Sequence, residues 1–265
     1  MSGVALALVL AAALIHAAWN RMLHGTGDRL AAATAGTVVS AVVLLPATFA
    51  FPPVRVWPLA AGSGVAEALY LYSLTAAYRR GELSFTYPVA RGIAPFLVTL
   101  GGALALGQPP GAARVAGSLA LGAGLAVISH AGLARGRGPA VAFAVLAGLA
   151  IATYSVIDAG AVRSASPAGY FGAVSAVEAV VLLAAVRPGR DRLRAAARVG
   201  TGIGLGSAAA YLLVLYAFTR APAGPVATIR ELSILFGILL ARERTGARVW
   251  LGGALCAAGA ALVLL

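Results

Sequence analysis

Seven ionisable side chains lie within long apolar stretches of this chain or near their ends. An ionisable side chain at the centre of a membrane-spanning helix costs about 2.5–3.5 kcal/mol on insertion scales, so it needs a partner or serves a function. We therefore take these residues as the candidates for chemistry. They are Glu67, Arg91, Glu178, Arg230 and Glu231, with His16 and Asp158 nearer the ends of their stretches.

Two of these residues are arginines at matching depths. Arg91 and Arg230 each stand eight residues into an apolar stretch. At about 1.5 Å per residue they lie about 12 Å from the helix start, close to the midplane of a core about 30 Å thick. Pro88 and Pro225 precede them and are expected to loosen the backbone around a cavity. Because a guanidinium binds carboxylate or phosphate through its planar fork, we predict that Arg91, Arg230 and the neighbouring Tyr87 bind an anionic substrate.

The acidic residues allow two interpretations. Glu67 and Glu178 lie about ten residues into their own stretches and are therefore also deep. A carboxyl group removed from water is a candidate for binding and releasing a proton, which is the chemistry of a proton-coupled carrier. The alternative is a permanent ion pair between either glutamate and an arginine, and Arg230 has Glu231 beside it as a further partner.

Two pairs of polar residues are candidates for gates. His16 and Asn20 are four residues apart and so share a helix face, and the same holds for Tyr154 and Asp158. We predict that His16, Asn20 and the intervening Trp19 contribute to a gate on one side of the membrane and Asp158 to a gate on the other. Tyr154 is also expected to line the substrate pocket, because its ring offers an apolar face with a hydroxyl group at the tip.

The elements that must position these residues are membrane helices. The chain has 265 residues, of which 61% are hydrophobic and 11% charged, against about 45–50% and 25% in soluble domains. Its apolar stretches are about 17–24 residues long, enough to cross a bilayer, and the first lacks the basic start of a signal peptide. The sequence predicts ten membrane helices, near 3–20, 30–50, 57–79, 83–106, 112–131, 139–159, 167–186, 197–219, 222–241 and 246–265.

The charge distribution predicts an orientation in the membrane. All twenty basic residues are arginines, and the formal net charge is +12. Fourteen arginines fall in odd-numbered loops and four in even-numbered ones, which is the positive-inside pattern and argues against a nucleic-acid partner. We therefore expect a multi-pass protein of the cell membrane with cytoplasmic odd loops and both termini outside.

Several chemistries are disfavoured by the composition. The chain has no lysine, so it lacks the lysine of an ATP-binding Walker A motif and a Schiff-base lysine. It has one cysteine, Cys256, and no HExxH zinc motif. We expect no cofactor, no metal and no enzymatic activity, with an intramembrane enzyme and a passive pore as the alternatives.

The two halves of the chain correspond to each other. Residues 16–20 match 154–158 at an offset of 138, Arg91 matches Arg230 at 139, and two glycines near 120 match two near 255 at 135. Two repeats of five helices must insert in opposite orientations, which is a plan common among secondary transporters. We predict an all-α membrane protein of ten transmembrane helices in two inverted five-helix repeats, 1–133 and 138–265.

Four motifs carry a resemblance to a known family. Residues 15–20, 77–84 with 87–92, 152–158 and 230–233 resemble the EamA-type members of the drug/metabolite transporter superfamily. The resemblance implies ten helices in two EamA repeats and transport of small organic solutes, often metabolite export. Many members are described with cytoplasmic termini, whereas the arginines here predict the reverse. We expect a secondary active transporter of small organic metabolites bearing a carboxylate, such as amino acids, that works by alternating access with Arg91 as the main substrate contact.

Overall fold

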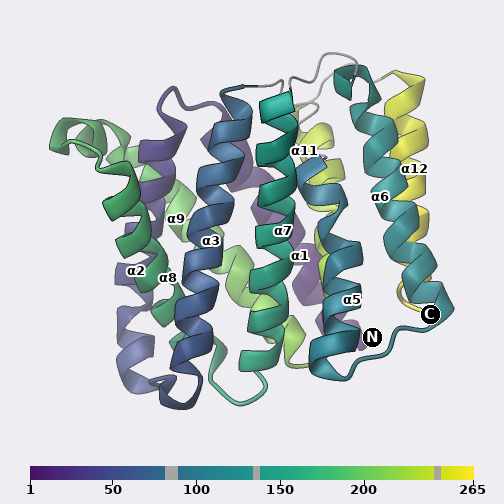
Figure 1. Cartoon of the computed structure of the whole chain (residues 1–265), viewed down its shortest axis with the longest axis horizontal. Coiled ribbons are helices and arrows are strands. Elements are labelled where there is room, and N and C mark those ends of the chain that lie inside the picture. The colour runs from purple at the N-terminus through teal and green to yellow at the C-terminus, as the bar shows by residue number, and fades with distance from the viewer. Residues whose placement is uncertain (81–88, 134–137, 242–245) are drawn as a thin grey trace.

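The computed structural model describes residues 1–80, 89–133, 138–241 and 246–265, and this part of the chain is almost entirely helical. In chain order the helices are α1 (Gly3–His24), α2 (Arg29–Ala50), the short η1 (Val54–Val56), α3 (Trp57–Tyr78), α5 (Ala94–Leu106), α6 (Ala112–Leu133), α7 (Gly138–Ala161), α8 (Pro167–Val186), α9 (Arg190–Phe218), α10 (Ala223–Arg230), α11 (Ser233–Ala241) and α12 (Ala247–Leu262). The helices run roughly side by side in a bundle, with α1, α9 and α11 behind α3 and α7 in the view of Figure 1.

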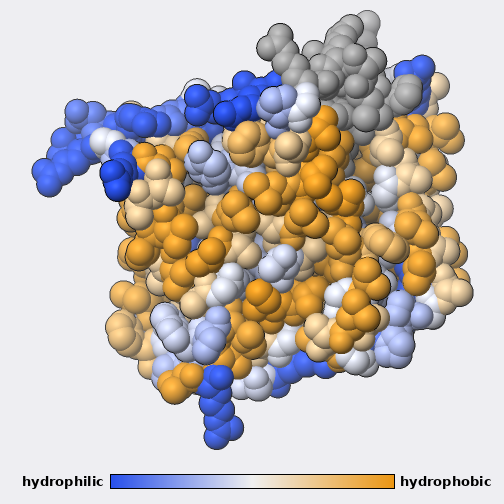
Figure 2. All heavy atoms as spheres, viewed as in Figure 1, coloured by the Kyte–Doolittle hydropathy of each residue, from blue (hydrophilic) through white to orange (hydrophobic). Residues whose placement is uncertain are grey.

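The bundle has the surface of a membrane protein. Six helical spans in the described part are long and apolar enough to cross a bilayer: α1, α2, Val89–Leu106, α7, α8 and α9. Large apolar side chains such as Phe49 and Leu104 are 77% and 79% exposed. They form an apolar band across the middle of the molecule, with hydrophilic residues gathered toward its ends (Figure 2). An apolar surface of this extent is suited to lipid and not to water, so the chain is a multi-pass membrane protein.

Two helices differ from the continuous segments expected near 83–106 and 222–241. The backbone is helical at 89–92, bends at Ile93 and continues as α5. Pro95 has no N–H with which to bond the carbonyl of Arg91, which explains a break at this position. In the second half α10 ends at Arg230, and a turn precedes α11. We expected Pro225 to loosen the backbone before Arg230. That expectation was wrong, because Pro225 lies in the first turn of α10, where a missing N–H is harmless.

Small residues let the helices of the two halves pack closely. α2 packs against α8 and α9, α3 against α7 and α8, α1 against α9, and α6 against α12. A Cβ added at Gly64 of α3 would lie 2.7 Å from the carbonyl oxygen of Val174 in α8. A Cβ at Gly124 of α6 would lie 2.6 Å from that of Gly252 in α12. Such backbone approaches are typical of helix contacts in membranes.

The polar ends of the bundle are unlike one another. Both termini lie toward the lower end in Figure 1, whereas a hydrophilic band runs along the upper end and out over the start of α9 (Figure 2). There Arg192 Nε donates a hydrogen bond to Asp28 Oδ2 at 2.8 Å, joining the start of α9 to that of α2. The helices also extend past the apolar stretches: α1 runs to His24 and α9 begins at Arg190.

Candidate functional site

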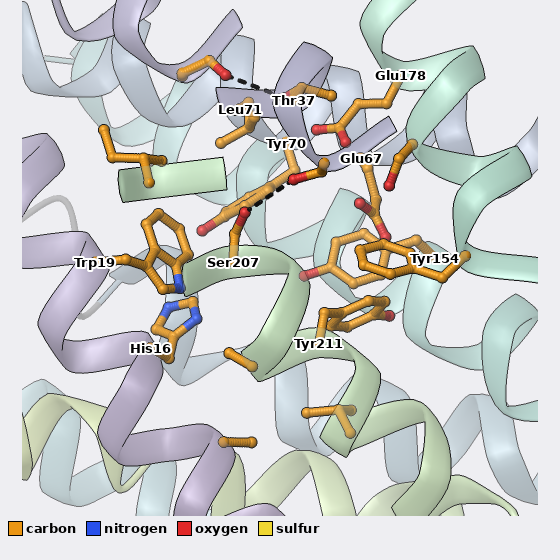
Figure 3. A pocket seen from close by; sticks show the side chains of 18 of the residues that line it. His16, Trp19, Thr37, Glu67, Tyr70, Leu71, Tyr154, Glu178, Ser207 and Tyr211 are labelled. Atoms are coloured by element: carbon orange, nitrogen blue, oxygen red, sulfur yellow. Dashed lines mark hydrogen bonds between the residues drawn. The ribbon is translucent and has the colours of Figure 1, made fainter. Parts of the chain in front are cut away.

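A small cavity lies in the middle of the bundle and brings together residues from α1, α2, α3, α7, α8, α9 and α10 (Figure 3). Its volume is about 80 Å³, whereas pockets for drug-sized ligands measure about 300–1,000 Å³. A metabolite larger than a few atoms therefore requires the lining helices to separate. The titratable side chains at its wall are those of His16, Glu67, Tyr70, Tyr154, Glu178, Tyr211 and Arg230.

Arg230 is one of the residues that line this cavity. Its side chain is 4% exposed, and Nε lies 3.9 Å from Glu231 Oε1. Its guanidinium carbon lies 5.9 Å from the ring centroids of both Tyr154 and Tyr211. Nε and Nη2 make no hydrogen bond to any described residue. These two donors suit a carboxylate, since a guanidinium commonly holds an anion through two parallel N–H groups.

Arg91, the expected main substrate contact, is not among the residues that line the cavity. Its side chain is 1% exposed, and Nε donates to Glu231 Oε2 at 2.5 Å. Nη1 lies 3.3 Å from His16 Nε2, and Nη2 donates to Ser233 Oγ at 3.5 Å. The acid that this arginine contacts is therefore Glu231, which the sequence had suggested as a partner for Arg230 alone.

Glu67 of α3 and Glu178 of α8 lie next to each other at one side of the cavity (Figure 3). They are 9% and 6% exposed. Among the described residues, no basic side chain lies within 4 Å of either carboxyl group.

Asp158 is held by hydroxyl groups rather than exposed at an edge. It is fully buried, and Tyr170 Oη donates a hydrogen bond to Oδ1 at 2.7 Å. Tyr211 Oη donates to Oδ2. Tyr170 was missed by sequence reasoning, although its spacing of twelve residues from Asp158, across a short turn, was the available signal. Asp158 is thus joined to the wall of the cavity through Tyr211.

Of the other expected gate residues, two line the cavity and one does not. His16 and Trp19 both line the cavity, and their rings meet edge to face with centroids 4.6 Å apart. Asn20 is half-buried and does not line it. The first helix was predicted to end near Asn20, but α1 continues to His24. Tyr87 lies outside the described residues. The assignment of His16, Trp19, Asn20 and Asp158 to gates stays a prediction.

Comparison with known proteins places this arrangement in a family. Residues 138–265 match the EamA-like transporter family. One solved protein, described simply as a crystal structure, is similar over 98% of both chains with a TM-score of 0.68 and 20% sequence identity, which shows the fold alone. No curated protein matches the chain. The family match identifies residues 138–265, the second half of the membrane bundle, as belonging to the EamA-like transporter family, part of the drug/metabolite transporter superfamily.

Proposed function

We propose that this protein is a secondary active transporter of the cell membrane that carries small organic metabolites bearing a carboxylate, such as amino acids, by alternating access. The observation that carries the proposal is Arg230, which lines the cavity with two guanidinium donors that no described residue uses. A carboxylate bound there gains two charge-assisted hydrogen bonds in a site shielded from water. Arg230 therefore replaces Arg91 as the proposed substrate contact.

The rest of the wall fits an organic solute with a carboxylate at one end. Tyr154 and Tyr211 offer ring faces beside Arg230 for an apolar side chain. Because the enclosed volume is only about 80 Å³, such a solute enters and leaves through conformations in which the lining helices have moved apart.

Two inverted repeats, 1–133 and 138–265, would supply that motion. The contacts between helices keep their pattern when each helix is replaced by its counterpart in the other half. The contact of α1 with α9 corresponds to that of α7 with α3, and the contact of α2 with α9 corresponds to that of α8 with α3. The contacts of α2 with α8 and of α6 with α12 map onto themselves. This exchange supports ten transmembrane helices in two repeats, the plan in which one half rocks against the other around a central site.

The proposal is tested by counterflow in proteoliposomes. Liposomes loaded with an unlabelled amino acid or monocarboxylate should take up the labelled compound in exchange, with saturation. Arg230→Gln should raise the half-saturating concentration roughly 10- to 100-fold, since hydrogen bonds to charged groups contribute about 1.5–3 kcal/mol. Arg230→Lys should restore little of this loss, because an ammonium keeps the charge and loses the fork.

Arg220→Gln serves as the matched control, since its guanidinium is exposed and bonds only to Tyr216 and Thr219 among the described residues. It should exchange like the unchanged protein. Flux that does not saturate would identify a pore, and a chemically altered solute would identify an enzyme. Unchanged counterflow by Arg230→Gln would overturn the assignment of Arg230.

A further inference from the structure

The carboxyl pair of Glu67 and Glu178 has a counterpart in the other half of the molecule. Residues 42–45 and 180–183 are both Val-Val-Leu-Leu, at an offset of 138 that aligns Ser40 with Glu178. Residues 64–80 align with 204–220 at an offset of 140, which aligns Glu67 with Ser207. The two carboxyl groups on α3 and α8 therefore correspond to two hydroxyl groups on α9 and α2.

The contacts around these positions support the alignment. Ser40 Oγ and Ser207 Oγ lie 3.5 Å apart, so the aligned serines form a pair just as the glutamates do. Gly64 of α3 abuts Val174 and Val177 of α8, and the aligned Gly204 of α9 abuts Gly36 and Val39 of α2. These neighbours are themselves aligned at the offset of 138. The backbones agree, and the difference between the halves is chemical: one pair can hold protons and the other cannot.

Among the described residues, no arginine forms an ion pair with Glu67 or Glu178. Asp158 accepts two tyrosine hydroxyl groups and faces the charge of Arg230, while Glu231 contacts Arg91. The two arginines and these two acids together carry no net charge. α2 contributes only Thr37 and Ser40 as polar groups, and neither titrates. The titratable groups that face the pair are Tyr70 from α3, Tyr154 and Asp158 from α7, Tyr170 from α8, Tyr211 from α9 and Arg230 from α10.

Two carboxylates side by side in a place without water repel each other, and a proton shared between them removes the repulsion. The pair then carries one negative charge in the cavity that Arg230 also lines. That charge repels an anion approaching Arg230. A second proton on the pair removes it, so that a proton and a substrate anion enter with no change in the net charge of the cavity.

We propose that Glu67 and Glu178 form a proton-binding site that couples transport to protons, with the proton and the substrate anion bound in the same step. This inference rests on the proposed function, because it assumes that an anion binds Arg230. It adds the coupling ion, the residues that hold it and the sign of the coupling: substrate moves in the direction in which protons flow.

The test compares the pair with its counterpart. Proteoliposomes are assayed with labelled alanine, glutamate and lactate, first by counterflow at equal pH and then with the outside more acidic by about two pH units. One proton per anion limits the accumulation ratio to about 100-fold for such a gradient. We expect the unchanged protein to accumulate roughly tenfold more label with the gradient. Glu67→Gln/Glu178→Gln should keep counterflow and lose this response, and Ser40→Ala/Ser207→Ala should keep both.

The outcomes separate the two proposals. Counterflow without any response to the pH gradient in the unchanged protein overturns the coupling and leaves the transport function standing. A full response in the double glutamine variant overturns the assignment to this pair. Retained counterflow at equal pH shows that a variant is folded.

A substrate-free measurement covers the case in which none of the three compounds is carried. Infrared difference spectra of the purified protein between about pH 9 and pH 5 should contain a band of protonated carboxyl groups that titrates. This band should be weakened in Glu67→Gln/Glu178→Gln, in which only Asp158 remains to contribute near the cavity, and it should be kept in full in Ser40→Ala/Ser207→Ala. An unchanged band in the glutamine variant contradicts the proposal without reference to any substrate.

Discussion

Replacing Glu231 with alanine removes the carboxylate that Arg91 Nε contacts at 2.5 Å, where the two side chains are 1% and 0% exposed. The guanidinium that remains is charged and cut off from water. Breaking a buried pair on one side costs about 3–5 kcal/mol, mostly because of the uncompensated charge. In a protein of this size 1 kcal/mol shifts the melting temperature by about 2–4 °C. We therefore expect Glu231→Ala to lower it by roughly 6–20 °C.

The assay is thermal unfolding of the detergent-purified protein, followed by tryptophan fluorescence, for Glu231→Ala, Arg91→Met and the double variant. Since the double variant removes both charges of the Arg91–Glu231 pair, it should be more stable than the sum of the two single effects predicts. The melting temperature of Arg91→Lys should fall between those of the unchanged protein and Arg91→Met, because lysine keeps the charge and loses the contacts to His16 and Ser233. Asp191→Ala is the control, since its carboxylate is fully exposed and 3.7 Å from Arg194.

Two results would refute this reasoning. A Glu231→Ala protein that melts within about 2 °C of the unchanged chain would show that the buried pair does not hold the helices together. Strictly additive effects in the double variant would show that Arg91 and Glu231 act independently.

Three more predictions concern packing, pH and orientation. Gly64→Ala should lower the melting temperature, because its Cβ would meet Val174 and Val177, whereas Gly62→Ala on the same helix, with its nearest neighbour at 3.9 Å, should not; equal melting curves would contradict the close packing. The hydrogen bond from Arg192 holds the pKa of Asp28 below its usual range, so its small stabilisation is present above about pH 4 and lost on acidification. The melting temperature of Asp28→Asn should therefore change less on acidification than that of the unchanged protein. Identical pH profiles of the two melting temperatures would contradict this. A reporter fused after Leu265 should be active only if it functions outside the cytoplasm; cytoplasmic activity would reverse the predicted orientation.

Most of the helices could be predicted from the sequence because apolar length is a local property, which about twenty consecutive residues carry by themselves. Polar extensions of a helix leave no trace in that length. α1 runs on through Arg21 to His24, and α9 begins at Arg190, seven residues before the apolar stretch predicted to begin at Ala197. The helix ends therefore differ from the prediction where a helix continues beyond its apolar part.

The partners inside the bundle could not be predicted in the same way, because they depend on how helices turn toward each other. Arg230 and Glu231 are neighbours in sequence, which suggested a pair. Consecutive residues of a helix point in different directions, so neighbours do not face each other. Glu231 therefore reaches Arg91 across the bundle, with Oε1 still 3.9 Å from Arg230. The cavity likewise depends on seven helices meeting at one level.

The break in the ninth segment was also beyond local reasoning. Residues 231–232 carry no proline, and the turn there is closed by backbone hydrogen bonds from Glu231 to Thr228 and from Leu232 to Ile229. A helix interrupted in this way is stable only where surrounding groups satisfy the freed backbone groups. That condition belongs to the assembled bundle and leaves no mark on the segment itself.

The two matching arginines have different contacts, and this difference has a consequence for the protein without bound solute. Arg91 contacts an acid and a histidine, while Arg230 keeps donors that no described residue uses. The position that matches Glu231 in the first half is Gly92, so the acid has no twin. In the proposed alternating-access cycle, the two conformations that exchange the roles of the halves would then differ in free energy. The population without solute would already favour one side of the membrane, and a ligand would shift it only by the difference in its affinity for the two states.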